Sequence, residues 1–218
     1  MLEKEAKQVE GEKIAAPKPI PGPPQFKNEL GLIHVYIGDG KGKTTASLGL
    51  ALRAIGQGFK VCVIQFMKGG YYFGEILAAE KYLKKRLKFF EFGQSTPYAD
   101  QIKKGIVKPS KAIFLEFEDE KEEYKKGLQF AKKVIQSGRF DLVILDEINV
   151  VLSMKHLDVK DVLDVMLSKP KNVELILTGR GAPDEIKDAA DYVNEIKMIK
   201  HPFERKRNKI LGRRGIEY

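Results

Sequence analysis

The sequence predicts an α/β fold, in which a mostly parallel sheet carries helices on both faces and forms three layers. Two observations predict this fold. From Gly31 onward, short apolar runs alternate with longer segments of helical periodicity. The short runs are rich in β-branched residues and are apolar throughout, as in strands that are buried on both faces.

The predicted elements follow one another along the chain. The strands are expected at residues 32–37, 60–66, 87–92, 141–146, 173–178 and 193–199. The helices are expected at residues 44–55, 74–83, 119–136, 159–167 and 183–190. Gly56 can end the first helix in a left-handed cap, Asp158 can cap the fourth helix, and Pro183 fits the first turn of the last helix.

Two segments lie outside this alternation. Residues 1–30 form a charged and then proline-rich extension, whose prolines exclude a regular helix. The extension is either a disordered tail or an arm that packs across a neighbouring surface. Residues 93–117 have no clean periodicity and are interpreted as a long loop, a kind of segment that often carries function. Residues 31–218 are expected to form one domain.

Composition excludes several classes of protein. The 218 residues are 43% hydrophobic, enough for one globular domain with a sizeable core. No apolar run approaches the roughly 20 residues that span a bilayer, and no signal peptide is recognisable. Cys62 is the one cysteine, so an internal disulfide is excluded and a core position is favoured. A cytoplasmic protein without a membrane partner is expected.

The formal net charge of +9 raises the question of a nucleic-acid partner. Residues 200–218 hold seven Lys or Arg against two Glu, so more than half of the excess lies in this tail. Elsewhere the basic side chains are mixed with acidic ones, as on a solvated surface. A nucleic-acid partner is therefore not expected, since a basic tail can equally approach a bound polyanion.

The most informative motif joins the first predicted strand to the first predicted helix. It reads Gly38-Asp39-Gly40-Lys41-Gly42-Lys43-Thr44-Thr45. Glycines allow backbone amides to point at an anion, Lys43 supplies a positive charge, and the Thr44 hydroxyl can bind Mg²⁺. The loop is one residue shorter than the usual P-loop, because Ile37 stands where the first glycine is expected, and Lys41 is an additional lysine. The motif predicts polyphosphate binding.

Two further signals follow predicted strands. Asp146 ends the apolar run 141–146 and Glu147 follows it, and Arg180 follows the run 173–178. The carboxyl ends of parallel strands share one edge of the sheet, which is also where the glycine-rich loop begins. One acid can hold Mg²⁺ directly or through water, and in a hydrolase Glu147 would orient the attacking water. Arg180 can bind phosphate oxygens with two hydrogen bonds.

These motifs, in this order, resemble the P-loop corrinoid adenosyltransferases over residues 31 to 218. The resemblance rests on GDGKGKTT (38–45), ALRAIGQG (51–58), VIQFMKG (63–69), Gly74-Glu75, VILDE (143–147), LTGRG (177–181), Val193-Asn194-Glu195, Lys200-His201-Pro202-Phe203 and Gly215-Ile216-Glu217-Tyr218.

The resemblance implies a three-layer P-loop NTPase-like fold and a particular use of ATP. In this family the nucleotide lies reversed in the loop, the Co(I) of a reduced corrinoid attacks the ribose 5′ carbon, and triphosphate leaves intact. Lys41, Lys43, Arg180 and Mg²⁺ are the groups that suit the charge on that leaving group. The family pattern adds Arg53 and His201 as nucleotide contacts. It also implies a homodimer and a flavin-type reductant protein as partners.

One departure concerns the corrinoid side of the site. Bacterial members carry an aromatic pair, including a tryptophan, in the loop after the third strand, where it helps to displace the lower axial ligand of cobalt. This chain has no tryptophan. Phe92 or Tyr98 is the candidate to take its place. The segment 205–214 is also more basic than is usual in the family.

Two other functions stay open at this level. One alternative to adenosyl transfer is an ATP-hydrolysing motor or switch, which would act on nucleic acid through its basic tail. The other is a carrier that binds nucleotide or corrinoid without turnover. Inorganic triphosphate as product indicates adenosyl transfer, ADP with phosphate indicates hydrolysis, and binding without product indicates a carrier.

Overall fold

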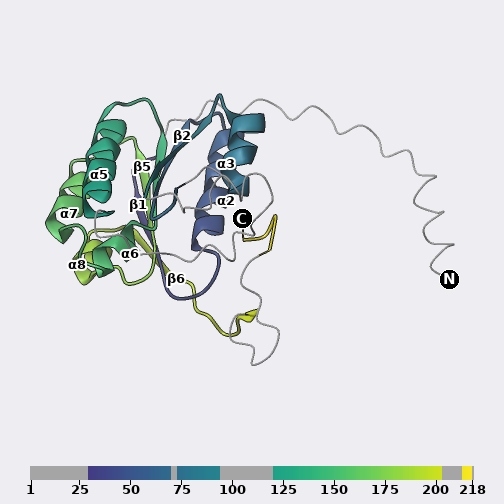
Figure 1. The fold of residues 1–218 in the computed structure, drawn as a ribbon. Helices are drawn as coiled ribbons and strands as arrows, with labels where there is room; N and C mark the ends of the chain where they lie inside the picture. The colour runs from purple at the N-terminus through teal and green to yellow at the C-terminus, as the bar shows by residue number, and fades with distance from the viewer. Residues whose placement is uncertain (1–28, 70–72, 94–119, 203–212, 218) are drawn as a thin grey trace, which may run out of the picture.

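Six parallel strands form one sheet in the order β3-β2-β4-β5-β1-β6. Helices lie on both sides of this sheet (Figure 1). The computed structural model describes residues 29–69, 73–93, 120–202 and 213–217. Most of the proline-rich extension lies outside the described residues, and so do residues 94–117 of the predicted long loop, which include Tyr98. The α/β class predicted from the alternation of patterns is confirmed.

All six predicted strands are present. They are β1 (Ile33–Ile37), β2 (Val61–Phe66), β3 (Leu87–Phe92), β4 (Leu142–Asp146), β5 (Glu174–Thr178) and β6 (Tyr192–Glu195). The last is shorter than the predicted run 193–199. Within the described part of the chain it is an edge strand that pairs with β1 alone, and the pairing stops where Ile37, the last residue of β1, lies opposite Glu195. Apolar residues beyond that point have no strand partner.

The helices also follow the prediction, with one addition. They are α2 (Lys43–Gly56), α3 (Gly74–Ala78), the π-helix η1 (Ala79–Leu83), α5 (Glu120–Gln136), α6 (Ile148–Ser153), α7 (Val159–Leu167) and α8 (Asp184–Asp188). Helix α6 was not predicted, because its apolar sequence continues the run of β4. The backbone of Glu147, at φ 64°, separates the two elements.

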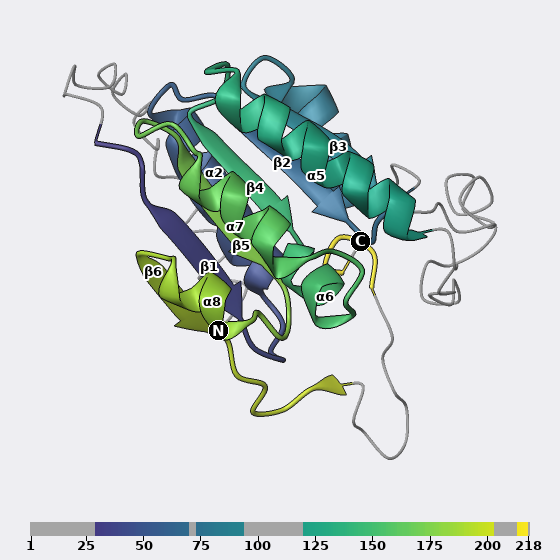
Figure 2. The ribbon, with the colours of Figure 1, turned by 90° about the vertical axis from the view of Figure 1, so that its left-hand side faces the viewer.

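Two hydrophobic clusters fill the spaces on the two faces of the sheet. Helices α5, α6, α7 and α8 cover one face, as Figure 2 shows, and α2 covers the other. Val35, Ile64 and Leu145 of the sheet belong to the first cluster, and Val63 and Ile144 to the second. Burying each such side chain contributes about 1.5–3 kcal/mol, so these clusters fix the helices against the sheet and define its carboxyl edge.

Two expectations from composition can be compared with the structure. Cys62 is completely buried in β2, and burial raises the pKa of its thiol to about 12. Its prediction as a core residue is confirmed. None of the helices in the described part of the chain combines the length and apolarity needed to cross a lipid bilayer.

Candidate active site

The glycine-rich loop lies at the carboxyl edge of the sheet, between β1 and α2. Gly38 and Gly42 have φ values of 99° and 124°, which favour glycine. The loop packs on the segment after β6, where the Gly40 amide donates to the Ile196 carbonyl at 2.8 Å. A Cβ on Gly38 or Gly40 would lie 2.3 or 2.6 Å from that carbonyl oxygen. Glycine at positions 38 and 40 therefore permits the close contact between the loop and the Ile196 backbone, which any side chain would block.

The ammonium of Lys43 is held in place by carbonyl groups of this loop. Its Nζ donates to the carbonyls of Gly38 at 2.6 Å and Gly40 at 2.8 Å, and the residue is only 7% exposed. Burial lowers the pKa of Lys43, with the positive charge of Arg180 acting in the same direction and Glu147 opposing it. An anion bound beside Lys43 would favour its charged form.

Asp146 is completely buried, and each of its two oxygens accepts two hydrogen bonds. Oδ1 accepts from the hydroxyls of Thr44 at 2.8 Å and Thr178 at 2.7 Å. Oδ2 accepts from Gln65 Nε2 and Lys68 Nζ, both at 3.0 Å. Burial alone would raise the pKa of Asp146, but Lys68 and the hydrogen bonds outweigh it and hold that pKa below its usual value. The carboxylate is therefore charged and has no free lone pair facing the site.

Lys68 was not singled out from the sequence, although it belongs to the VIQFMKG string. Besides the contact to Asp146, its Nζ lies 3.7 Å from Glu75 and 5.1 Å from the centroid of the Phe73 ring. Burial opposes the charge on Lys68, but Asp146 and Glu75 outweigh burial and raise its pKa. The signal that could have revealed it is its position just after a buried strand, at the same sheet edge as the other charged residues.

Glu147 and Arg180 both reach the same cavity. The Glu147 amide donates to Thr178 Oγ1 at 3.0 Å, and burial together with the nearby Asp146 raises the pKa of the Glu147 carboxyl. Gly179 precedes Arg180 at φ 134°, and a Cβ there would lie 2.8 Å from the Val150 amide nitrogen. The glycine of the TGRG string therefore lets β5 turn closely past α6 and brings Arg180 to the site.

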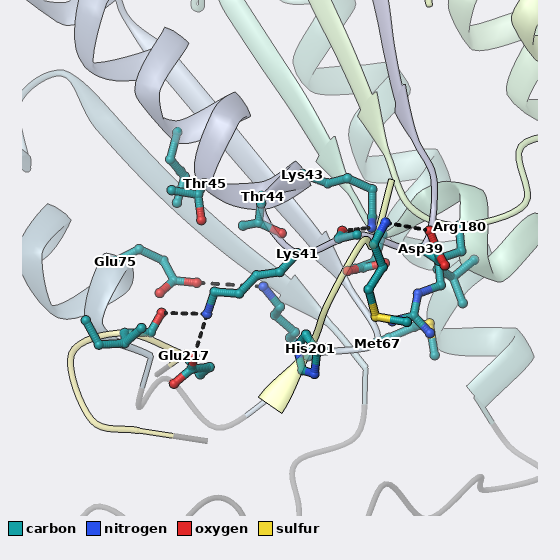
Figure 3. Close-up of a pocket in the computed structure, with 18 of the residues that line it drawn as sticks. Asp39, Lys41, Lys43, Thr44, Thr45, Met67, Glu75, Arg180, His201 and Glu217 are labelled. Carbon is teal, nitrogen blue, oxygen red and sulfur yellow. Dashed lines mark hydrogen bonds and ion pairs between the residues drawn. The ribbon is translucent and has the colours of Figure 1, made fainter. Parts of the chain in front are cut away.

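The cavity has a volume of about 840 Å³. Figure 3 shows charged side chains converging on it from the loop, from the strand ends and from the C-terminal turn. Of the residues predicted from sequence, those that line it are Asp39, Gly40, Lys41, Gly42, Lys43, Thr44, Thr45, Glu147, Arg180 and His201. Those that sequence reasoning did not assign to it are Leu48, Met67, Lys68, Gly74, Glu75, Val150, Met198, Gly215, Ile216 and Glu217.

Four predicted site residues with described positions lie outside the cavity lining. Gly38 and Asp146 are placed just behind it, where they bind Lys43 and Thr44. Arg53 is exposed on α2. The ring centroid of Phe92 lies 6.5 Å from that of Phe66 and 5.4 Å from that of Phe130, and this partly buried side chain packs against the first hydrophobic cluster.

The donor set at the cavity fits Mg²⁺ in a particular way. Among the described residues, no group of three or more His, Cys, Asp and Glu side chains could hold a metal ion alone. The Thr44 hydroxyl and the Glu147 carboxylate nevertheless provide two oxygen ligands at the cavity. Mg²⁺ is commonly bound by one or two protein oxygens together with phosphates and water. The residues therefore fit a metal ion that arrives with a polyphosphate.

Comparison with known proteins agrees with this geometry. Residues 29–218 match the family model described as ATP:corrinoid adenosyltransferase BtuR/CobO/CobP. The chain belongs to this family. It is an enzyme, a transferase of cobalamin biosynthesis whose substrates are ATP and a corrinoid. The resemblance predicted from the ordered motifs is confirmed.

Several relatives are similar over most of their length. A corrinoid adenosyltransferase of Sinorhizobium sp is 33% identical, over 97% of this chain and 88% of the relative. One from Escherichia coli K12 is 31% identical over 83% of each chain, and CobA of Salmonella typhimurium is 30% identical over 89% of each. Domain III of the Thermotoga maritima replication initiation protein DnaA matches in structure with a TM-score of 0.34 and 11% identity, over 76% of this chain and 54% of that one, too low to bear on the argument.

Proposed function

We propose that this enzyme transfers the 5′-deoxyadenosyl group of ATP to the Co(I) of a reduced corrinoid and releases intact triphosphate. The cobalt–carbon bond forms as the bond between the 5′ carbon and the α-phosphate oxygen breaks. The electron pair of the broken bond leaves with triphosphate, and cobalt is formally oxidised from Co(I) to Co(III). The product is adenosylcobalamin or a precursor of it.

The observation that carries this proposal is that cationic side chains line the same cavity as the glycine-rich loop. Lys41, Lys43 and Arg180 line it together with the amides of the glycine-rich loop. In the displacement, negative charge develops on the leaving triphosphate, and donors fixed in advance stabilise that charge most effectively. Lys43 is fixed in this way, because two loop carbonyls hold its ammonium in place.

No general base is needed, because Co(I) is itself the nucleophile. The acidic residues of the site are accordingly assigned to other tasks. Asp146 binds the Thr44 hydroxyl at 2.8 Å and thereby orients it. Thr44 and Glu147 would hold Mg²⁺, which supplies further positive charge to the triphosphate when it is bound. Asp146 acts behind them, since all of its acceptor positions are taken.

The nucleotide contacts proposed here are residues 39–45, Arg180 and His201, all of which line the cavity. We extend the family's reversed nucleotide orientation to this chain as part of the proposal. Arg53 is not included, because its exposed position on α2 lies away from the cavity lining. For the corrinoid side, Tyr98 is the remaining aromatic candidate from the sequence.

Two partners complete the proposal on the strength of the family resemblance. A flavin-type reductant protein would supply Co(I), since Co(II) is not a nucleophile for this displacement. The enzyme would act as a homodimer in the cytoplasm. Neither a nucleic acid nor a membrane has a part in the proposed reaction.

The decisive experiment incubates the protein with ATP, Mg²⁺ and chemically reduced cobalamin under anaerobic conditions. The absorbance spectrum should change to that of an alkylated corrinoid, and anion-exchange analysis should find one triphosphate per corrinoid converted. ADP with phosphate, formed without any change in the corrinoid, would instead identify an ATP hydrolase. Nucleotide binding without either product would identify a carrier.

A further inference from the structure

The C-terminal turn lies against the glycine-rich loop, far from it in sequence. Lys41 Nζ donates to Glu217 Oε1 at 2.6 Å and lies 3.4 Å from the carbonyl oxygen of Ile216. Figure 3 shows the side chain of Lys41 extended along the cavity toward Glu217. Gly215, Ile216 and Glu217 also line the cavity. The additional lysine of the shortened loop is therefore held by a segment about 175 residues away.

Glu217 is itself held in place by Arg213. The Arg213 amide donates to Glu217 Oε2 at 2.7 Å, and the guanidinium donates to both carboxylate oxygens, at 3.2 and 3.3 Å. These hydrogen bonds, and then the one from Lys41, lower the pKa of Glu217 to about 2. The carboxylate is thus charged and fixed in direction before any nucleotide binds.

The ammonium of a lysine has three N–H donors. Glu217 and the Ile216 carbonyl take two of those of Lys41, which leaves one to meet a phosphate oxygen in the cavity. Lys41 is 44% exposed, and a free lysine side chain at such a position would sample many rotamers. The cluster of Lys41, Arg213 and Glu217 contains two cations and one carboxylate, so it still attracts an anion despite the ion pair.

We propose that Glu217 is a positioning residue, which fixes the Lys41 ammonium at the cavity wall so that its third N–H meets the triphosphate of ATP. This inference rests on the proposed function, in which Lys41 binds triphosphate. The C-terminal turn then completes the phosphate site rather than merely covering it. The opposite role is chemically conceivable, because a carboxylate beside a polyphosphate can compete with it for the lysine. The two roles differ in the sign of the effect on affinity.

The test is a double-mutant cycle on ATP affinity. Four variants are compared with the parent protein: Glu217→Ala, Glu217→Gln, Lys41→Ala, and Lys41→Ala combined with Glu217→Ala. Calorimetry gives the Kd for ATP and for inorganic tripolyphosphate in the presence of Mg²⁺. Glu123→Gln is the matched control, since Glu123 forms an ion pair of similar length with Lys126 on α5, outside the cavity lining.

We expect Glu217→Ala to raise the Kd for both ligands about fivefold and Glu217→Gln to raise it somewhat less. Lys41→Ala should raise both Kd values at least tenfold. The double variant should bind no more weakly than Lys41→Ala alone, because Glu217 acts only through that lysine. Thermal unfolding of each variant checks that the fold is intact, and Glu217→Gln keeps the test valid if Glu217→Ala folds poorly.

Three outcomes would overturn the inference. Tighter binding by the Glu217 variants would show that the carboxylate competes with triphosphate. Additive losses in the double variant would show that Glu217 acts on the ligand by a route other than Lys41. An unchanged Kd for ATP and tripolyphosphate in Lys41→Ala would show that Lys41 does not bind triphosphate. That result would contradict the proposed function itself, unlike the other two.

Discussion

At the scale of single residues, the charge on Lys43 gives the most direct test of the proposed phosphate site. We expect Lys43→Ala to lower kcat/KM at least a hundredfold, because a fixed cation beside a developing polyanion contributes several kcal/mol to the transition state. The measurement is the rate of alkylated corrinoid formation from Co(I), with circular dichroism to confirm the fold. Lys126→Ala, on the exposed face of α5, is the control. A near-parental rate in Lys43→Ala would contradict the assignment of the loop.

The ionisation of Glu147 gives a prediction about stability. Burial and the charge of Asp146 raise the pKa of Glu147 above its value in the unfolded chain. A raised acid pKa means that the folded state loses stability as the pH rises through that value. Without nucleotide, we therefore expect Glu147→Gln to have a higher Tm than the parent at pH 7.

The same linkage predicts that this difference in Tm shrinks as the pH falls toward 4, where the parent carboxyl is also neutral. Calorimetric scans across this pH range measure it. A difference in Tm that stays constant with pH would mean that the amide acts through packing or hydrogen bonding instead.

Sequence reasoning at the residue scale identified the groups that local motifs carry. Lys43, Thr44 and Arg180 were found because each follows a buried strand in a recognisable string. Lys68 also follows a buried strand, but neither it nor Glu217 was assigned a role, since their contacts are ion pairs with Asp146 and Lys41, residues distant in the chain. Such pairs depend on the folded arrangement and leave no periodic pattern in a single sequence.

At the scale of elements, Phe92 at the end of β3 was predicted to contact the corrinoid, but in the structure it packs against neighbouring aromatic rings. Phe92 lies between Phe66 and Phe130, and a Cβ on Gly127 of α5 would approach Phe92 Cγ to 2.8 Å. This close fit indicates that Phe92 joins β3 to α5. We expect Phe92→Ala to lower the free energy of unfolding by about 3 kcal/mol, and Phe92→Leu by less, because leucine fills part of the cavity.

Urea unfolding measures this loss, and a kinetic comparison gives the control. If Phe92 serves packing, the alanine variant should lose the same fraction of activity whether the corrinoid is supplied as Co(II) with reductant or as Co(I). A loss confined to Co(II), with an unchanged free energy of unfolding, would assign the ring to displacement of the lower axial ligand.

Elements that bury regular apolar faces were predicted closely, and those set by their neighbours were not. β3 and α7 have the predicted limits. Leu87 and Phe89 of β3 are buried on either side of the exposed Lys88, and the buried residues of α7 have helical spacing. Helix α6 was not predicted, since four of the five residues from Ile148 to Leu152 are apolar like the preceding strand. The positive φ of Glu147 separates the helix from that strand. β6 ends early because its one partner ends. Backbone strain and the length of a neighbouring strand cannot be read from periodicity.

At the scale of the whole molecule, the parallel sheet explains why distant segments meet at one site. The strands β1, β2, β4 and β5 run in the same direction, so the residues that follow them arrive at one edge. These residues are the glycine-rich loop, Lys68, Glu147 and Arg180. The segments after β6 and at the C-terminus then close the cavity through contacts to Gly40 and Lys41. The site therefore depends on the complete sheet and on the C-terminal turn.

The same architecture predicts where the folding unit begins. The buried residues of the two hydrophobic clusters lie between Ile33 and Ile186. The entry to β1 is fixed by Glu174, which accepts hydrogen bonds from the Gly31 amide at 2.7 Å and the Leu32 amide at 2.9 Å. We propose that residues 31–218 form the domain. A chain that begins at Glu29 should then unfold within about 2 °C of the full chain.

A chain that begins at Ile33 is the matched control for this truncation. It lacks the two amides that bind Glu174, and so leaves part of that carboxylate without its partners. Unsatisfied groups of this kind cost about 1–3 kcal/mol when buried, less when half-exposed, and we therefore expect a lower Tm than for the chain from Glu29. Thermal unfolding of the three chains side by side measures both effects. If the chain from Glu29 loses as much as the control, residues 1–28 act as an arm that packs on the domain, and the boundary must move toward the N-terminus.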